Sequence, residues 1–143
     1  MIKIVYPSAG FKMKEENNKE FIFDVIRKKW ILLTPEEWVR QNFIQYLIVE
    51  KEYPASLIAV EKEIKLGELK KRCDIIVYKN SLPWMIVECK EMNVPVNEKT
   101  FAQILNYNQT LQVAYLITTN GTITYGLTTS NKILLDEIPS YNS

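Results

Sequence analysis

The chain has 143 residues, 47% of them hydrophobic and 24% charged, with a formal net charge of +1 at pH 7. This length and composition are typical of one globular domain with its own core, so we expect a single domain over residues 1–143. The near-neutral charge excludes a global basic field for nucleic acid, although a local basic face remains open. The absence of histidine excludes histidine acid–base catalysis, Ser-His and Cys-His nucleophiles and His-ligated zinc.

The N-terminal part is expected to be mostly β structure. Residues 1 to about 20 predict a short strand followed by a polar connector. Residues 21–33 are apolar on either side of Arg27-Lys28-Lys29, which favours a hairpin with a basic, solvated tip.

A helix is predicted directly after this hairpin. Thr34 suits the N-cap, Pro35 the first helical position, and Glu37 can complete a capping box. The helix should continue to about Val49 and bury Trp38, together with Phe43, Ile44, Leu47 and Ile48.

Three strands should follow the helix. Residues 57–66, 71–78 and 84–89 have the composition of strands, and a turn centred on Asn80-Ser81-Leu82-Pro83 joins the last two. Both of these are almost continuously apolar, so we expect central, antiparallel strands covered on two faces.

The C-terminal part predicts a second helix and more strands. Residues 98–111 carry an apolar stripe at helical spacing, and 113–118 read as a short strand. Asn120-Gly121 predicts a hairpin turn into 122–127, and 132–138 are a possible last strand. The predicted fold is α/β, with helix, three strands, helix and strand around a mixed sheet, and added β elements at both ends.

Charged residues enter the two apolar strands at Asp74 and at Glu88-Cys89-Lys90. A buried carboxylate is costly unless a cation meets it. Alternation places Glu88 and Lys90 on one face, and antiparallel pairing can bring Asp74 beside them. Two carboxylates and a backbone carbonyl, that of Cys89, suit Mg²⁺, for which Mn²⁺ is expected to substitute. Lys90 could then act on a metal-bound water and on the charge of a phosphodiester.

This pattern resembles the PD-(D/E)xK nuclease superfamily, whose core order α-β-β-β-α-β matches the predicted elements. Gln103 and Tyr107, four residues apart on the second helix, look like the Gln-x-x-x-Tyr motif of several nuclease branches. Residues 33–41 and 87–90 resemble the N-terminal nuclease domain of type I restriction enzyme R subunits. The resemblance covers residues 20–128.

The resemblance implies site roles for particular residues. Asp74 and Glu88 would be metal ligands and Lys90 the catalytic lysine, with Glu37 and Gln103 in support. Tyr107 would contact DNA or orient the site. The chain has no Gly-x-x-x-x-Gly-Lys-Ser/Thr loop, so no nucleotide is expected as a ligand.

Several residues keep a second interpretation. Glu37 could serve only as a helix cap, which leaves Glu36 as the other candidate acid. Lys70, Lys71 and Arg72 could contact phosphates or form a charged loop. Gln103 and Tyr107 could be ordinary residues on the surface of the helix. Glu61 and Glu63 could lie on a solvated face or border the site. Arg40 and Gln41 could support the site from the first helix.

The leading functional hypothesis is a Mg²⁺-dependent nuclease acting on DNA. The alternative is a non-cleaving protein on the same fold that binds nucleic acid or a partner chain, or that assembles through residues 122–138, for example as a homodimer. Cys73 and Cys89 are expected to be buried thiols, which suits a reducing cytoplasm. No run approaches the roughly 20 apolar residues of a membrane span, so no membrane is expected as a partner.

Overall fold

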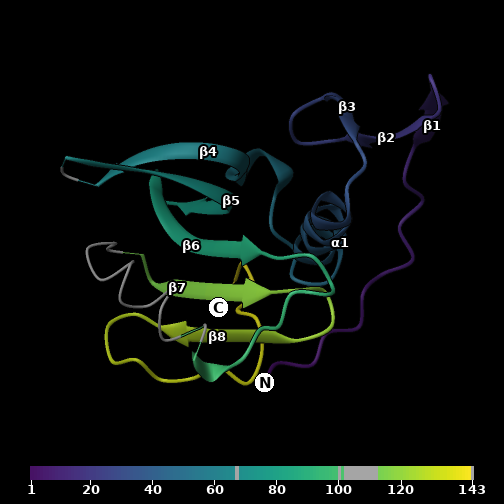
Figure 1. Cartoon of the computed structure of the whole chain (residues 1–143). Coiled ribbons are helices and arrows are strands. Elements are labelled where there is room, and N and C mark those ends of the chain that lie inside the picture. Colours follow the sequence, from purple (N-terminus) through teal and green to yellow (C-terminus); the bar gives the residue numbers. More distant parts are fainter. Residues whose placement is uncertain (67, 100, 102–112, 143) are drawn as a thin grey trace.

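The computed structural model describes the chain except residues 67, 100, 102–112 and 143. The described residues form two sheets and one long helix (Figure 1). The smaller sheet contains β1 (Met13–Glu16), β2 (Lys19–Asp24) and β3 (Lys29–Leu32). The helix α1 (Pro35–Val49) and a short 3₁₀ turn, η1 (Ala55–Leu57), follow. The larger sheet contains β4 (Ile58–Leu66), β5 (Leu69–Lys79), β6 (Leu82–Cys89), β7 (Tyr115–Thr119) and β8 (Thr124–Thr128).

The larger sheet is mixed, as predicted. Its order is β4-β5-β6-β7-β8, with β6 and β7 parallel and the other neighbours antiparallel. The helix α1 contacts β5 and β6 and is seen nearly end-on in Figure 1. Phe101 N–H donates to the carbonyl of Asn97, which begins a helical turn. The remainder of the predicted second helix lies outside the described residues, so the complete α-β-β-β-α-β order remains a prediction.

The helix α1 begins where the sequence predicts. Thr34 accepts a hydrogen bond from the Glu37 N–H at 3.0 Å, Pro35 occupies the first turn, and the helix ends at Val49. The expected burial of Trp38 is wrong, because 39% of Trp38 is exposed. The helix instead turns Phe43 and its apolar neighbours toward the sheet, and Phe11 packs edge-on against the Trp38 ring.

Both predicted turns are present. Asn80 and Ser81 have φ values of 54° and 65°, the left-handed conformations that a two-residue hairpin turn requires. At the second turn, Gly121 has a φ of 90°. The Asn120 side chain fixes this turn by accepting from the N–H groups of Thr122 and Ile123.

The two ends of the chain differ from the prediction. Ile2 makes only an isolated bridge to Thr124, whereas β1 lies in the expected polar connector. The predicted last strand is reduced to a single bridge between Leu127 and Leu134. Most side chains of the polar strand β1 are exposed, and Leu134 is 54% exposed. Neither segment therefore shows the alternation of buried and exposed side chains on which strand prediction depends.

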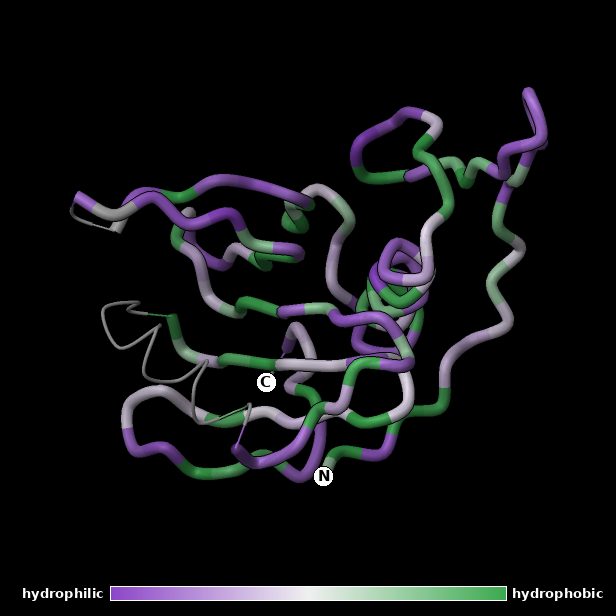
Figure 2. The backbone as a smooth tube through the Cα atoms, in the orientation of Figure 1, coloured by the Kyte–Doolittle hydropathy of each residue, from purple (hydrophilic) through white to green (hydrophobic). Residues whose placement is uncertain are grey.

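The core lies on both faces of the larger sheet. Ile75, Val87 and Ile117 pack toward α1, while Ile76 and Ile86 form a second cluster on the opposite face. The prediction that β5 and β6 are central strands covered on both faces is therefore confirmed. Figure 2 shows hydrophilic residues along much of the β4–β5 hairpin and hydrophobic stretches in β6 and β7. No helix among the described residues is long and apolar enough to cross a membrane.

Candidate active site

A distortion in the β4–β5 ladder directs Asp74 toward α1. Val60 pairs with Ile75 and Lys62 with Cys73, but Glu61 and Asp74 between them are not paired. Glu61 has a φ of 53°, which is unusual inside a strand. Cys73 consequently faces the same cluster as Ile76, three positions later, and the alternation is interrupted at Asp74.

Asp74 connects three elements through its two carboxylate oxygens. Oδ1 accepts from Arg40 Nη2 of α1 at 2.8 Å, and Oδ2 accepts from the backbone N–H of Cys89 at 2.8 Å. Ile75 pairs with Val87, so Asp74 and Glu88 occupy the next positions on adjacent strands. The predicted approach of β5 to the end of β6 is therefore present.

Arg40 lies at the centre of the acidic cluster. Its Nη2 donates to Glu36, Glu61 and Asp74 at 2.9, 2.5 and 2.8 Å, and its Nη1 donates to Glu37 at 2.8 Å. Burial alone would lower the pKa of Arg40, but the bond to Asp74 and the surrounding carboxylates raise it overall. Arg40 is therefore permanently charged.

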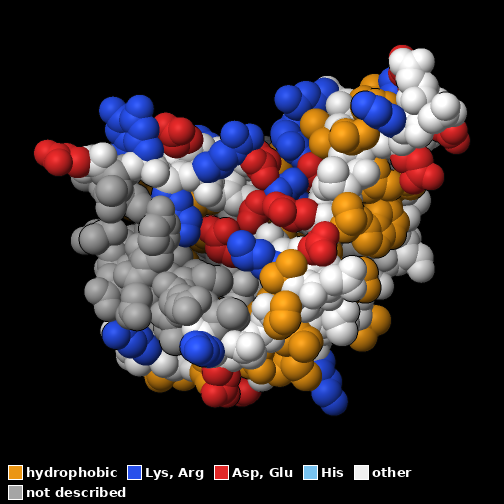
Figure 3. Space-filling model, in the orientation of Figure 1, with side chains coloured by type: hydrophobic (Ala, Val, Ile, Leu, Met, Phe, Trp, Pro, Cys, Tyr) orange, Lys and Arg blue, Asp and Glu red, His pale blue; other side chains and the backbone are white. Residues whose placement is uncertain are grey.

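Three of these carboxylates lie close to one another. One oxygen each from Glu36, Glu61 and Asp74 lies within 4.8 Å of the others. Figure 3 shows acidic side chains gathered in a hollow at the middle of this face, between the β4–β5 hairpin and α1, with Lys and Arg at its border. Clustered carboxylate oxygens are the donor set that Mg²⁺ and Mn²⁺ prefer, so these residues fit a divalent cation.

Glu88 borders the cluster from the other face of the sheet. Its Oε1 is 3.2 Å from Lys71 Nζ but is buried without a well-aligned hydrogen bond among the described residues. Burial raises the pKa of Glu88; Lys71 opposes this shift and the nearby Asp74 adds to it. A buried acceptor next to a second carboxylate also fits a cation.

Lys90 directly follows β6 and is exposed. Its backbone N–H donates to the Thr119 carbonyl at 2.8 Å. Burial and Asp74 raise the pKa of Glu36, whereas Arg40 and Lys90 act to lower it. The Lys90 ammonium is therefore an electrostatic neighbour of the cluster, on the side of Glu36.

Glu37 lies apart from the three grouped carboxylates. It accepts from Arg40, from Arg27 at 2.8 Å and from Gln41 at 3.2 Å. Arg27 also bonds Asp24 at 2.5 Å, so the expectation of a solvated Arg27 is wrong. Sequence spacing does not predict the contact between Arg27 and Glu37, because the two residues belong to different elements.

The predicted basic residues line the approach along β5. Arg72 bonds Glu61 at 2.5 Å, and Lys70 lies 3.9 Å from Glu63. Lys71 contacts Glu88 as described above. The other two predicted site residues, Gln103 and Tyr107, lie outside the described residues.

The grouping of Glu36 and Glu61 with Asp74 differs from the predicted ligand pair of Asp74 and Glu88. Glu36 carried one local signal, because Glu36 and Arg40 are four apart on a helix. Glu61 carried none, since its position depends on the ladder distortion. At Cys89 the N–H contacts Asp74, and a ligand role for its carbonyl remains a prediction.

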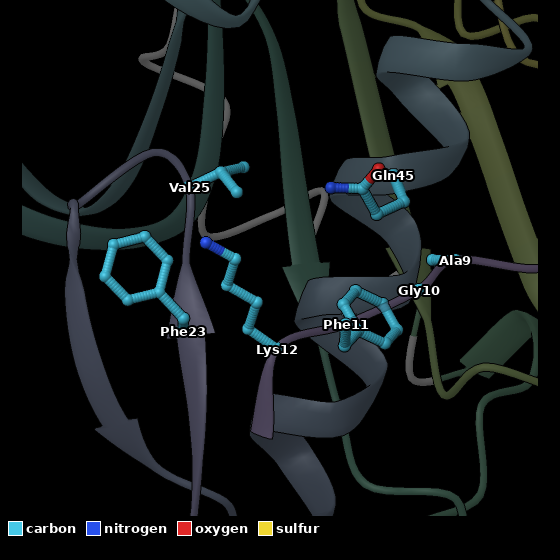
Figure 4. A pocket seen from close by; sticks show the side chains of 7 residues that line it. All are labelled: Ala9, Gly10, Phe11, Lys12, Phe23, Val25 and Gln45. Carbon is cyan, nitrogen blue, oxygen red and sulfur yellow. The ribbon is translucent and has the colours of Figure 1, made fainter. Parts of the chain in front are cut away.

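A separate cavity of about 280 Å³ lies between the N-terminal segment, β2 and α1. Its lining includes Phe11, Lys12, Phe23, Val25 and Gln45, and Figure 4 shows Lys12 extending toward Phe23 and Val25. None of the clustered carboxylates lines it. The acidic cluster is therefore the better candidate for catalysis.

Comparison with known families identifies the chain. Residues 35–139 match the sequence model of the type I restriction enzyme R protein N terminus. The chain belongs to this family. No curated protein and no solved structure matches the chain. Membership of the R protein N-terminal family is consistent with nuclease function, and the matched range includes α1, the acidic cluster and Lys90.

Proposed function

We propose that the chain is a metal-dependent nuclease that hydrolyses DNA phosphodiester bonds. The observation that carries the proposal is the convergence of Glu36, Glu61 and Asp74 within 4.8 Å, in a chain of the R protein N-terminal family. Such a cluster offers hard oxygen ligands beside an exposed lysine, an arrangement that suits metal-dependent phosphodiester hydrolysis.

Asp74 and Glu88 would hold Mg²⁺ or Mn²⁺, together with the carbonyl of Cys89. Glu36 and Glu61 are further oxygen donors, grouped with Asp74. A bound divalent ion would supply a water of lowered pKa and neutralise charge on the phosphodiester.

The remaining site residues act through charge and position. Lys90, exposed beside Glu36, would donate a hydrogen bond to a phosphate oxygen or to the attacking water. Glu37 would act as a positioning residue, since it holds Arg40 against Asp74. Gln103 and Tyr107 complete the proposal as a supporting residue and a DNA contact on the second helix.

The β4–β5 hairpin would contact the DNA backbone. Lys65 and Lys70 are exposed and directly paired across the strands, although like charges opposite each other are destabilising. Arg72 and Lys71 lie further along the same strand toward the site. A phosphate backbone along the hairpin would offset the repulsion between the two lysines.

We also propose that cleavage does not require ATP.

Plasmid cleavage with Mg²⁺ or Mn²⁺ tests the proposal. Asp74→Asn and Lys90→Ala should each lower the cleavage rate by at least about a hundredfold, the usual scale for lost electrostatic catalysis. Lys29→Ala, an exposed lysine on β3, is the control and should cleave as the unmodified chain does. Undiminished cleavage by both site variants would overturn the proposed site.

A non-cleaving role is the second candidate, because Arg40 already pairs with the three clustered carboxylates without an ion. This alternative predicts salt-sensitive DNA binding in EDTA, with no product at any metal concentration. If the chain serves assembly instead, sedimentation should show a dimer or a complex with a partner chain. A concentration-independent monomer would argue against self-assembly.

A further inference from the structure

The hydrogen bonds of Arg40 are unevenly distributed. Its Nη2 lies within 2.9 Å of three carboxylates, although it carries only two protons. Its Nε is buried and has no hydrogen-bond partner among the described residues. The carboxylates therefore crowd one end of the guanidinium while another donor is left unused.

Nη2 occupies the position that a cation would take. A divalent ion in this cluster needs the same oxygens of Glu36, Glu61 and Asp74 at about 2.0–2.6 Å. Arg40 Nη2 already lies between these oxygens at 2.5–2.9 Å. A positively charged nitrogen and a metal ion cannot share this space, because both their volumes and their charges oppose it.

Arg40 has an anchor that does not depend on the cluster. Its Nη1 donates to Glu37 Oε1, and Glu37 is held in turn by Arg27 and Gln41. This contact can hold the Arg40 guanidinium beside Glu37 while Nη2 releases Glu36, Glu61 and Asp74. The buried Nε has no hydrogen-bond partner among the described residues, so this donor gains no bond from the metal-free arrangement.

We propose that Arg40 is a built-in counterion that competes with the divalent cation for the carboxylates of the site. Arg40 offsets part of the negative charge of Glu36, Glu61 and Asp74 in the metal-free protein and withdraws its Nη2 when the ion binds. It thereby sets the affinity of the site for metal, because binding must include the cost of this withdrawal. The inference rests on the proposed metal site and adds its regulation.

Calorimetric titration with Mn²⁺ tests the inference on the full chain. Arg40→Gln should bind Mn²⁺ at least about tenfold more tightly, since the competing charge is removed while a hydrogen-bonding side chain remains. Arg72→Gln is the matched control, because Arg72 bonds the other oxygen of Glu61 but is 69% exposed. Its affinity should stay within about threefold of the unmodified chain, because exposed charges are screened.

A folded Arg40→Gln variant with equal or weaker Mn²⁺ affinity would overturn the inference. Adding Asp74→Asn to Arg40→Gln should remove the gain, which locates the ion at this cluster. Absence of Mn²⁺ binding by both the unmodified chain and Arg40→Gln would also overturn it.

Side-chain NMR of the unmodified, ¹⁵N-arginine-labelled chain gives a second measurement that does not need a variant to fold. Added Mg²⁺ should shift the Arg40 guanidinium signals strongly and those of Arg27 little, because the partners of the Arg27 side chain among the described residues are Asp24 and Glu37, which lie outside the three grouped carboxylates. Unchanged Arg40 signals at Mg²⁺ concentrations that saturate the chain would contradict the inference.

The two proposals can fail separately. Tighter Mn²⁺ binding by Arg40→Gln without DNA cleavage by any form supports the counterion and removes the nuclease. Mg²⁺-dependent cleavage by the unmodified chain, with no gain in affinity in Arg40→Gln, supports the nuclease and removes the counterion.

Discussion

Nη2 of Arg27 lies 2.8 Å from Oε1 of Glu37, and this ion pair joins the β2–β3 turn to the first turn of α1. Glu37 also accepts from Arg40, which contacts Asp74. A continuous series of charged contacts therefore runs from the three-stranded sheet to the candidate active site.

Glu37→Gln should destabilise the fold by about 3 kcal/mol, because removing one charge of a buried network leaves its partners uncompensated. The Glu37 side chain is only 5% exposed and faces two arginines. Urea unfolding measures the change. Glu36→Gln is the matched control, because the Glu36 side chain is 48% exposed. This substitution should lower the free energy of unfolding by less than about 1 kcal/mol. Equal losses in the two variants would contradict this assignment.

Asp24 should contribute stability that disappears in acid. Burial alone would raise the pKa of Asp24, but bonds from the Arg27 side chain and from the N–H groups of Arg27 and Ile26 lower it overall. With a lowered folded pKa, the unfolded chain binds more protons as the pH falls below about 4, so the contribution is lost there.

Asp24→Asn should therefore cost about 2 kcal/mol at pH 7, and the difference from the unmodified chain should vanish as the pH falls through the pKa of folded Asp24. Unfolding free energies measured across this range check the expectation. Asp136→Asn, at an exposed position, should change stability by less than about 0.5 kcal/mol. A constant difference for Asp24→Asn across the range would be inconsistent with the lowered pKa.

The two cysteines should be unreactive in the folded protein. Burial raises the pKa of Cys73 from 9.0 to about 11 and that of Cys89 well above its usual value. Because the thiolate is the reactive form, a thiol reagent at about pH 8 should label neither cysteine until the chain unfolds. Mass spectrometry before and after adding denaturant checks this, and rapid labelling of either folded thiol would refute it.

Gly126→Ala should destabilise the protein by about 2 kcal/mol through overpacking. An added Cβ would lie 2.5 Å from Ile117 Cδ1 and 3.1 Å from Leu135 Cδ1. Gly10→Ala is the control, since nothing lies within 4 Å of its Cβ position. Thermal unfolding compares the two variants, and a Gly126→Ala protein as stable as Gly10→Ala would show that β7 and β8 can adjust without cost.

Local chemistry made part of the fold predictable. Thr34 and Pro35 determine the start of α1 through contacts within one turn, and Asn80-Ser81 supplies the conformations of its hairpin. Strand β1 could not be predicted, because its polar side chains lack an apolar alternation. Trp38 was misplaced because propensity does not fix which face of a helix meets the sheet.

The candidate site was predictable only where neighbouring strands determine it. Asp74 and Glu88 lie at adjacent positions because a short turn sets the pairing of β5 with β6. Glu61 could not be assigned to the cluster, since regular alternation fails where its φ is 53°. The contact between Arg40 of α1 and Asp74 of β5 depends on packing between elements, which sequence spacing does not predict.

The parallel pairing of β6 with β7 has a consequence for the kinetics of folding. It joins Met85 to Tyr115, whereas β4, β5 and β6 are connected by short turns. Closing the longer loop costs more chain entropy before any contact compensates for it. The β4–β6 meander should therefore form early, and docking of β7 should limit the rate at which the native sheet is completed.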